Sequence, residues 1–417
     1  MSECFDVIVL GGGPAGTTSA ALVAQAGHRV LLLEREQMPR FHIGESLMPE
    51  TYWVFERLGV LEKMKHSSCV RKLSVQFVSS MGRESQPFYF QDHDPRECSA
   101  TWQVLRSEFD HMLFENAAEK GADCRDETRV LDVRFDGDRA TGVRLQTSGG
   151  ETEDFDARVV VDATGLNSLV ANKLGLLVPN PRLRKAAIWG YYEAAKRDSG
   201  VDAGATIILH TRSKEAWFWY IPLADDVTSV GVVGDRDYLL AGRGTPEEVF
   251  EEELVNCPAV LTRLVEAHLI SKFRVAREFS YTTSRPAGEG WVLVGDALGF
   301  IDPIYSSGVY LALKSGELAA DAINEGLARG DLSGAQLGGW AGQFEGGVRW
   351  VRKLVDNFYT NEFSFGAFMK QHPEHRGNLT DLLIGRVFHD GAGRIFDDMD
   401  PWLDQIRGGQ QPQQQSK

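Results

Sequence analysis

The length, composition and charge of the chain exclude several classes of protein. Its 417 residues are enough for more than one domain and a large core. The formal net charge of −15 argues against nucleic acid and anionic membrane surfaces as partners. No apolar run approaches the roughly 20 residues of a spanning helix, so we expect no integral membrane segment.

The cysteines show no paired metal-ligand spacing, so the sequence predicts no metal site. Their odd number, in a chain without a signal peptide, fits reduced thiols and predicts a cytoplasmic location. They are Cys4, Cys69, Cys98, Cys124 and Cys257.

The N-terminal segment has the pattern of a dinucleotide-binding motif. An apolar run over residues 5–10 is followed at once by a glycine-rich turn and then by a small-residue helical pattern. Gly11 would make the tight turn, Gly13 would let the backbone approach a pyrophosphate, and Gly16 would let helix and strand pack closely. A second apolar run ends at Glu34, where a carboxylate can accept both ribose hydroxyls. The segment therefore predicts a bound dinucleotide.

An aromatic strand with two tryptophans is predicted in the middle of the chain. Because residues two apart in a strand face the same side, Trp217 and Trp219 would present adjacent indoles to one surface, and Pro222 would end the pairing. Such a face can be ordinary core packing, since large aromatic side chains are mostly buried. Beside a bound dinucleotide, the same two indoles can instead form a wall.

Two other apolar runs end in acidic turns and favour FAD over a nicotinamide dinucleotide. Residues 159–161 lead into Asp162, a pattern seen where the chain re-enters an FAD domain. Residues 291–294 lead into Gly295 and Asp296 ahead of a long predicted helix, a turn that suits the ribityl chain and pyrophosphate of FAD. Asp296 could also be a helix cap without a role in binding.

The last part of the chain is predicted to be helical. Residues 308–327 have apolar side chains at helical spacing, and a glycine-rich link at 330–339 leads to a second helical stretch over 340–369. The second stretch has more large apolar side chains than a surface helix needs, and they could form core packing or line a substrate pocket. They are Trp350, Leu354, Phe358, Phe363, Phe365 and Phe368.

These elements predict an α/β fold with two interleaved domains. A Rossmann-like FAD-binding domain would be assembled from residues 1–70, 98–170 and 275–330. A mixed β-sheet domain on the substrate side, which carries the two tryptophans, would be assembled from residues 71–97 and 171–274. A C-terminal helical region would follow at 331–407, and a low-complexity, disordered tail at 408–417.

Four motifs make the chain resemble the flavin-dependent halogenases that act on phenols and pyrroles. They are Gly11 to Gly16, Gly44-Glu45-Ser46-Leu47-Met48-Pro49, Trp217-x-Trp219-x-Ile221-Pro222, and Asp302-Pro303-Ile304-Tyr305-Ser306-Ser307-Gly308-Val309. The resemblance covers about residues 3–370 and places the chain in the FAD monooxygenase and geranylgeranyl reductase superfamily, with a para-hydroxybenzoate hydroxylase-like FAD domain. In this family the tryptophan–proline motif keeps substrate from the flavin, which disfavours direct hydroxylation.

The resemblance also implies which residues bind FAD and halide. Chloride or bromide would be held by backbone N–H groups near Ser307 and Gly308, at the start of a helix and beside the flavin ring. Glu45 would belong to the strap between the flavin site and the halogenation site. The FAD contacts would come from Gly11, Gly13, Ala15, Gly16, Glu34, Arg40, Gly44, Ser46, Arg106, Asp162, Asp296, Pro303 and Gly308.

Halogenation in this family further requires a lysine between flavin and substrate. Reduced FAD, O2 and halide give hypohalous acid, which travels through a tunnel to the lysine, and the lysine delivers the halogen to an electron-rich aromatic ring. Lys72 is the candidate, because Lys72 and Phe77 follow the Gly-Glu-Ser segment at the family's interval and in its order. The ammonium can hydrogen-bond the hypohalite, or the neutral amine can form a haloamine.

The surroundings of Lys72 depart from the family pattern. The family commonly has an aromatic residue and a proline before the lysine and a glycine two positions after it, whereas this chain has Cys69-Val70-Arg71 before it and Ser74 after it. Lys72 could therefore be a solvated surface lysine. Other functions stay open as well: a geranylgeranyl reductase-like reductase of isoprenoid double bonds, an aromatic hydroxylase, and a non-catalytic flavin-binding protein.

The sequence also bears on partners. Because only one dinucleotide motif is visible, we expect a separate, transiently bound flavin reductase to supply the reduced FAD. The substrate could be a free phenol, a phenol or pyrrole on a carrier protein, or a larger natural product. An acidic carrier is disfavoured by the acidic surface, although Arg182, Arg184 and Lys185 could form a local basic patch. The oligomeric state is not predicted.

Overall fold

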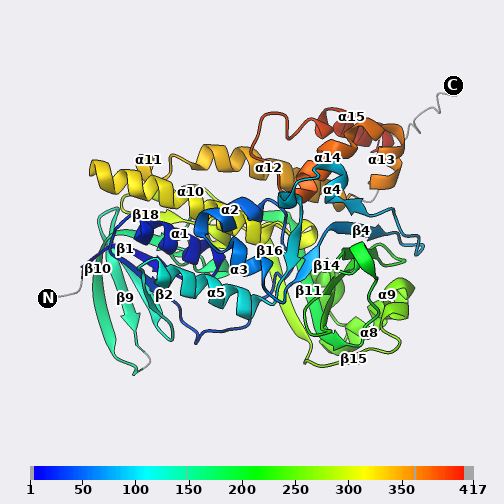
Figure 1. The fold of residues 1–417 in the computed structure, drawn as a ribbon, viewed down its shortest axis with the longest axis horizontal. Coiled ribbons are helices and arrows are strands. Elements are labelled where there is room, and N and C mark those ends of the chain that lie inside the picture. The colour runs from blue at the N-terminus through cyan, green and yellow to red at the C-terminus, as the bar shows by residue number, and fades with distance from the viewer. Residues whose placement is uncertain (1–3, 148, 361–362, 408–417) are drawn as a thin grey trace.

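The computed structural model describes residues 4–147, 149–360 and 363–407, and the tail predicted to be disordered lies outside them. Two large sheets stand side by side, and helices close one side of the molecule (Figure 1). This arrangement confirms the predicted α/β class, the FAD-domain architecture and the C-terminal helices. Among the described helices, none has the length and apolar character needed to cross a membrane.

The first sheet is built around parallel strands. Its main path runs β17-β18-β10-β1-β2-β7, and β9 joins β10 to β8 at its side. The strands are β1 (Cys4–Leu10), β2 (Val30–Leu33), β7 (Asp123–Arg125), β8 (Arg129–Asp136), β9 (Arg139–Gln146), β10 (Thr152–Asp162), β17 (Ala287–Gly288) and β18 (Trp291–Leu293). Strands β2, β1, β10 and β18 run parallel, so their carboxyl ends meet at one edge, where an open α/β sheet binds its ligand.

The second sheet is mostly antiparallel and follows the order β15-β11-β14-β13-β12-β4-β5, with β16 paired to β11. The strands are β4 (Ser74–Val78), β5 (Phe88–Tyr89), β11 (Leu177–Glu193), β12 (Thr206–His210), β13 (Ala216–Pro222), β14 (Thr228–Asp235), β15 (His268–Leu269) and β16 (Arg274–Thr283). A small pair, β3 (Val70–Lys72) and β6 (Thr101–Gln103), lies apart from both large sheets in the hydrogen-bonding pattern. The domain boundaries stay a prediction; the one drawn at residue 275 falls inside β16.

The helices divide into three groups. In the FAD-binding part, α1 packs against both α5 and α10. This group comprises α1 (Pro14–Gln25), α2 (Thr51–Leu58), α3 (Leu61–Lys65), α5 (Arg106–Glu119), α6 (Leu169–Lys173) and α10 (Gly308–Arg329). Beside the second sheet are α7 (Arg236–Leu240), α8 (Pro246–Asn256) and α9 (Pro258–Arg263). The C-terminal region contains α11 (Gly334–Leu337), α12 (Ala341–Phe358), α13 (Phe365–Gln371), α14 (Arg376–Ile384) and α15 (Ile395–Arg407). The short helix α4 (Phe90–His93) packs against α14 of this C-terminal region (Figure 1).

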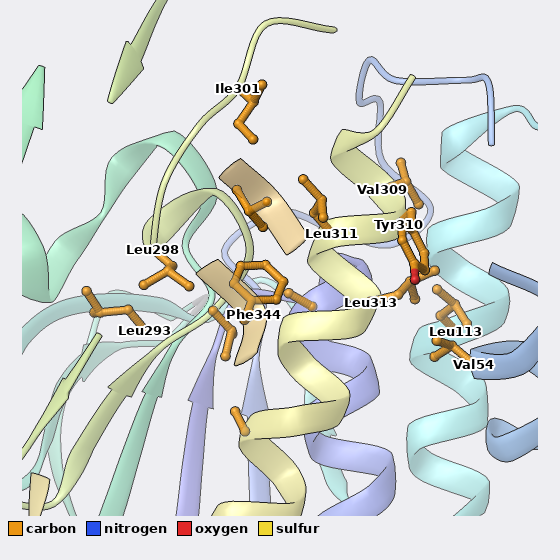
Figure 2. Close-up of a cluster of buried hydrophobic side chains, with 14 of the residues drawn as sticks. Val54, Leu113, Leu293, Leu298, Ile301, Val309, Tyr310, Leu311, Leu313 and Phe344 are labelled. Carbon is orange, nitrogen blue, oxygen red and sulfur yellow. The ribbon is translucent and has the colours of Figure 1, made fainter. Parts of the chain in front are cut away.

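Helix α10 is packed against other elements on two opposite sides. This packing fixes the position of its first turn. Figure 2 shows Tyr310 and Leu313 pointing toward Leu113 and Val54, while Leu311 faces the other way. The side chains of Val54, Leu113 and Leu313 are at most 1% exposed. Because both sides of α10 are packed, the loop that precedes it is anchored at its C-terminal end.

The second helical stretch, predicted as one stretch over residues 340–369, is divided into two helices. Helix α12 ends at Phe358 and α13 begins at Phe365. The Ser364 side chain accepts a hydrogen bond from the Ala367 N–H at 3.3 Å, so a new helix starts there with its own N-cap. The glycine-rich link also contains the short helix α11.

The large apolar residues of this stretch belong to the core. Leu354, Phe358 and Phe368 are buried, and Trp350, Phe363 and Phe365 are partly buried against the same cluster. None of the six lines the large cavity that the described residues enclose. The structure therefore supports the interpretation as core packing.

The turn from β1 into α1 depends on the absence of side chains. Gly11 has φ +105°, in the region that favours glycine, and a Cβ there would lie 2.4 Å from the Ala163 carbonyl oxygen. A Cβ on Gly16 would lie 2.0 Å from the Gly11 carbonyl oxygen. Strand and helix can approach this closely only with glycine at both positions.

We predict that Gly16→Ala destabilises the protein by about 3 kcal/mol or more, at the upper end of overpacking effects, and weakens FAD binding. The added methyl group must displace the backbone of the turn. Gly346→Ala in α12 is the control, because a Cβ there meets nothing within 4 Å. Chemical denaturation and flavin titration measure both effects, and unchanged stability and affinity in Gly16→Ala would contradict the packing argument.

Candidate active site

A cavity of about 760 Å³ extends from the dinucleotide motif to the tryptophans of β13. Both sheets contribute to it, since its walls come from the carboxyl end of the parallel strands and from the face of β11, β12 and β13. Most of the predicted site residues line it. They are Gly11, Gly13, Ala15, Glu34, Arg40, Gly44, Glu45, Ser46, Arg106, Trp217, Trp219, Asp296, Pro303 and Gly308.

Four predicted residues do not line the cavity, namely Gly16, Lys72, Asp162 and Ser307. Asp162 is fully buried, and its carboxylate accepts hydrogen bonds from the N–H groups of Thr164 at 3.0 Å and Val170 at 2.7 Å. It thereby shapes the turn after β10 rather than facing a ligand.

Glu34 lies at the dinucleotide end of the cavity. One carboxylate oxygen accepts the Gly12 N–H at 2.9 Å and the other accepts the Glu36 N–H at 3.0 Å. These bonds hold the side chain at the cavity wall, at the end of β2. A carboxylate in this position is suited to bind the ribose hydroxyls of a dinucleotide.

Two arginines share one buried carboxylate beside this end. Arg106 Nε donates to Asp110 Oδ1 at 2.7 Å, and Arg40 Nη1 donates to Asp110 Oδ2 at 2.7 Å. Burial alone would raise the pKa of Asp110, but the two guanidinium groups lower it overall. Arg40 Nε also lies 3.4 Å from Glu34 Oε2, so the cluster of two guanidinium groups and two carboxylates is formally neutral. The guanidinium N–H groups are nevertheless suited to hydrogen-bond a pyrophosphate. Sequence analysis did not assign Asp110 a role, although it follows Arg106 by one helical turn.

The segment before α10 has the geometry of an anion site. A short turn of 3₁₀ helix, η5 (Pro303–Tyr305), is followed by Ser306 in the left-handed region with φ +59°. Ser307 is the N-cap of α10, and its buried Oγ has no hydrogen-bond partner among the described residues. Gly308 faces the cavity, with no atom within 4 Å of the position of a Cβ. Free N–H groups at the start of such a long helix attract anions.

The two tryptophans of β13 lie on the same face, with ring centroids 6.4 Å apart. Trp189 of β11 continues this aromatic surface at 6.1 Å from Trp219, and sequence analysis did not identify it. Trp219 Nε1 donates to Ser229 Oγ at 3.1 Å. Space for this indole comes from Gly231 on β14, where a Cβ would lie 2.2 Å from Trp219 Cζ2. The indoles thus form a fixed wall of the cavity.

Lys72 is buried, so the interpretation of this residue as a solvated surface lysine is wrong. Its side chain is 3% exposed, and Nζ donates to Ser46 Oγ at 2.8 Å and to the Leu47 carbonyl oxygen at 3.0 Å. Burial lowers the pKa of Lys72 to about 7, because the ammonium is removed from water. Its neighbour Arg71 points outward and stacks over Trp102 at 4.8 Å.

Ser46 connects Lys72 to the cavity wall. Ser46 lines the cavity, binds Lys72 and also hydrogen-bonds Thr206 Oγ1 at 2.9 Å. The amine therefore lies directly behind the wall that residues 44–46 form.

Glu45 is a second buried group that titrates near neutral pH. Its side chain is 2% exposed, and Tyr191 of β11 donates its hydroxyl to Glu45 Oε1 at 2.6 Å. Burial raises the pKa of Glu45 to about 7. Removal from water also raises the pKa of Asp296 to about 6. Tyr191 has no sequence signal of its own, since it lies in the apolar pattern of β11.

The prediction of a basic patch is wrong for one of its three residues, Lys185. Arg182 and Arg184 are exposed, but Lys185 is buried and donates to Asp235 at 2.8 Å. Alternation along β11 turns Lys185 toward the opposite side from Arg184. Lys185 therefore cannot contribute to a surface for an acidic carrier.

Comparisons with known proteins show the family of this chain. The model of the family described as FAD binding domain matches residues 4–325. A chlorinase of 1H-pyrrole-2-carbonyl on a peptidyl-carrier protein, from Pseudomonas fluorescens, is 30% identical to this chain. The alignment covers 95% of this chain and 92% of the chlorinase. The corresponding brominase from Pseudoalteromonas luteoviolacea is also 30% identical, and the alignment covers 93% of this chain and 94% of the brominase.

Solved structures show the same relationship. The flavin-dependent brominase Bmp2 superposes with a TM-score of 0.87 at 29% identity and covers 97% of this chain and 100% of its own. The fold and the cavity define an FAD-binding flavoprotein. Within that class, the chain belongs to the flavin-dependent halogenases.

We predict that the Lys72 amine titrates near pH 7 in the folded protein. Burial favours the neutral amine, and no carboxylate of the described residues pairs with it, so the protonated fraction of Lys72 should fall several pH units earlier than in other lysines. Nitrogen NMR of lysine-labelled protein measures this, with Lys72→Met identifying the resonance. A titration at the ordinary value near 10.5 would contradict the prediction.

Proposed function

We propose that this chain uses reduced FAD, O2 and chloride or bromide to form hypohalous acid, and transfers the halogen to a phenol or pyrrole ring, free or carrier-bound. The observation that carries the proposal is Lys72, a buried amine with a pKa of about 7 directly behind the cavity wall. Such an amine is present in appreciable amounts both as a hydrogen-bond donor and as a nucleophile near neutral pH.

The residues of the cavity suit FAD, which when bound would supply the reaction of its reduced form with O2. Glu34 would bind the ribose, and the glycines of the β1–α1 turn would leave room for the pyrophosphate beside the guanidinium groups of Arg40 and Arg106. The N–H groups near Ser307 and Gly308 would orient the halide at the start of α10.

Other groups would control access and protons. Trp217 and Trp219 would keep the aromatic substrate out of the cavity, so that only a small halogenating species passes. Glu45 would hold or release a proton near neutral pH at the carboxyl bonded to Tyr191. Ser46 would orient the Lys72 amine toward the cavity.

A carrier-bound substrate is supported by the two carrier-specific relatives, and a free phenol or pyrrole is compatible with the same chemistry. A cytoplasmic location belongs to the proposal on the ground of unpaired cysteines, which suit a reducing compartment.

We predict that Lys72→Ala retains FAD affinity and oxygen-dependent oxidation of reduced FAD but forms no halogenated product. Halogen transfer requires the amine, whereas the flavin reactions do not. Lys72→Arg should fail as well, because a guanidinium stays protonated and has a different shape. Lys63→Ala is the control, since this lysine lies at the surface and pairs with Glu119.

Mass spectrometry of phenols and pyrroles, free and on a carrier protein, with bromide, O2 and reduced FAD tests this prediction. Product from Lys72→Ala would remove Lys72 from the mechanism. Reduction of an isoprenoid by the wild type, without halogenation of any aromatic, would favour the reductase alternative. Hydroxylated product alone would favour the hydroxylase.

We also predict that the isolated protein does not accept hydride from NADPH at a rate that sustains turnover. Its reduced flavin would come from a separate reductase, because the chain has a single dinucleotide motif. Stopped-flow absorbance of the bound flavin measures the rate with and without an added reductase. Rapid reduction by NADPH in the absence of reductase would contradict the two-component proposal.

A further inference from the structure

Tyr359 connects two parts of the candidate site that are far apart in the sequence. It caps α12, outside the part of the chain that the FAD-binding family model matches. Its hydroxyl accepts the indole N–H of Trp217 at 2.9 Å and donates to Asp302 Oδ2 at 2.9 Å. The tryptophan wall and the segment that leads to Ser307 and Gly308 are therefore joined through one hydroxyl group.

The direction of these hydrogen bonds is determined by chemistry. An indole nitrogen can only donate, and the tyrosine hydroxyl has one hydrogen, which leaves the carboxylate of Asp302 as the acceptor. The other carboxylate oxygen of Asp302 accepts the Ile304 N–H at 3.1 Å. Both oxygens are thus committed, one to Tyr359 and one to the turn that opens the halide-facing segment.

The surroundings hold this chain of bonds rigidly. Trp217 and Asp302 are 3% and 2% exposed, so water does not readily replace a lost partner. The Lys185 ammonium lies 3.9 Å from the centroid of the Tyr359 ring, a cation–π contact that fixes the ring plane. Lys185 is itself held by Asp235. Lys185 therefore supports the site indirectly, through its contact with the Tyr359 ring.

We propose that Tyr359 is a positioning residue that fixes the orientation of the Trp217 indole relative to residues 302–308. Tyr359 does not line the cavity, so it would act through Trp217 and Asp302. As long as both bonds are made, the wall and the N–H groups near Ser307 and Gly308 keep one relative geometry. The expected effect on halide binding rests on the proposed function. The hydrogen-bonded link from Trp217 through Tyr359 to Asp302 does not depend on it.

Tyr359→Phe is the direct test, because it removes only the hydroxyl. In the FAD-free protein labelled with fluorotryptophan, the Trp217 resonance, identified with Trp217→Phe, should shift or broaden. In the loaded enzyme, FAD affinity should stay within about twofold of wild type, while the KM for bromide rises at least about fivefold with a smaller change in kcat.

Tyr238→Phe is the matched control. Like Tyr359, Tyr238 in α7 is partly buried, donates its hydroxyl to a carboxylate, Glu253 Oε1, at 2.7 Å, and has a cationic side chain over its ring, Arg243 at 4.7 Å. Tyr238 does not line the cavity, so the variant should leave the Trp217 resonance and the KM for bromide unchanged. Should Tyr359→Phe fail to fold, Asp302→Asn tests the same link, and the Trp217 resonance should move in that variant too.

Two results would overturn the proposal. One is a Trp217 resonance in Tyr359→Phe that matches wild type, and the other is an equal change in Tyr238→Phe. A wild-type protein that halogenates nothing would defeat the proposed function alone, because the fluorine spectrum reports the link between Trp217 and Asp302 without flavin, halide or turnover.

Discussion

The candidate site depends on how residues 44–48 cross between the two sheets. Main-chain bonds from Val104 N–H to the Glu45 oxygen at 2.7 Å and from Leu47 N–H to the Trp102 oxygen at 3.1 Å hold this segment against β6. Its side chains then reach the second sheet, Glu45 to Tyr191 and Ser46 to Thr206. One short segment therefore determines where the flavin-side cavity ends and where the Lys72 amine lies. Displacing it would move both buried titrating groups together.

Local chemistry explains what could be predicted from the sequence. The β1–α1 turn is predictable because only glycine tolerates the approach of its backbone, and the indoles of Trp217 and Trp219 share a face because strands alternate. The FAD-binding fold and the halogenase family followed from such motifs and are confirmed. The burial of Lys72 could not be predicted in this way, since its flanking residues Arg71 and Ser74 differ from the family pattern.

The partners that sequence analysis missed are distant in the chain. Tyr191 lies 146 positions from Glu45, and Tyr359 lies 142 positions from Trp217, so neither pair has a local pattern. The break between α12 and α13 was missed because its apolar spacing continues through residues 359–364, while a serine N-cap starts a new helix. Lys185 resembled a surface cation by composition, but the alternation of β11 turns it inward to Asp235.

In the proposed mechanism, the tryptophan wall lets an oxidised halogen pass and keeps the aromatic substrate from the flavin. The most direct measurement is one reaction of the wild-type protein with reduced FAD, bromide, an electron-rich aromatic compound and isotopically heavy O2, analysed by mass spectrometry. We expect a product with bromine in place of a ring hydrogen and without heavy oxygen. Heavy oxygen on the aromatic ring would contradict the proposed role of the wall, because hydroxylation requires direct contact between the substrate and the flavin.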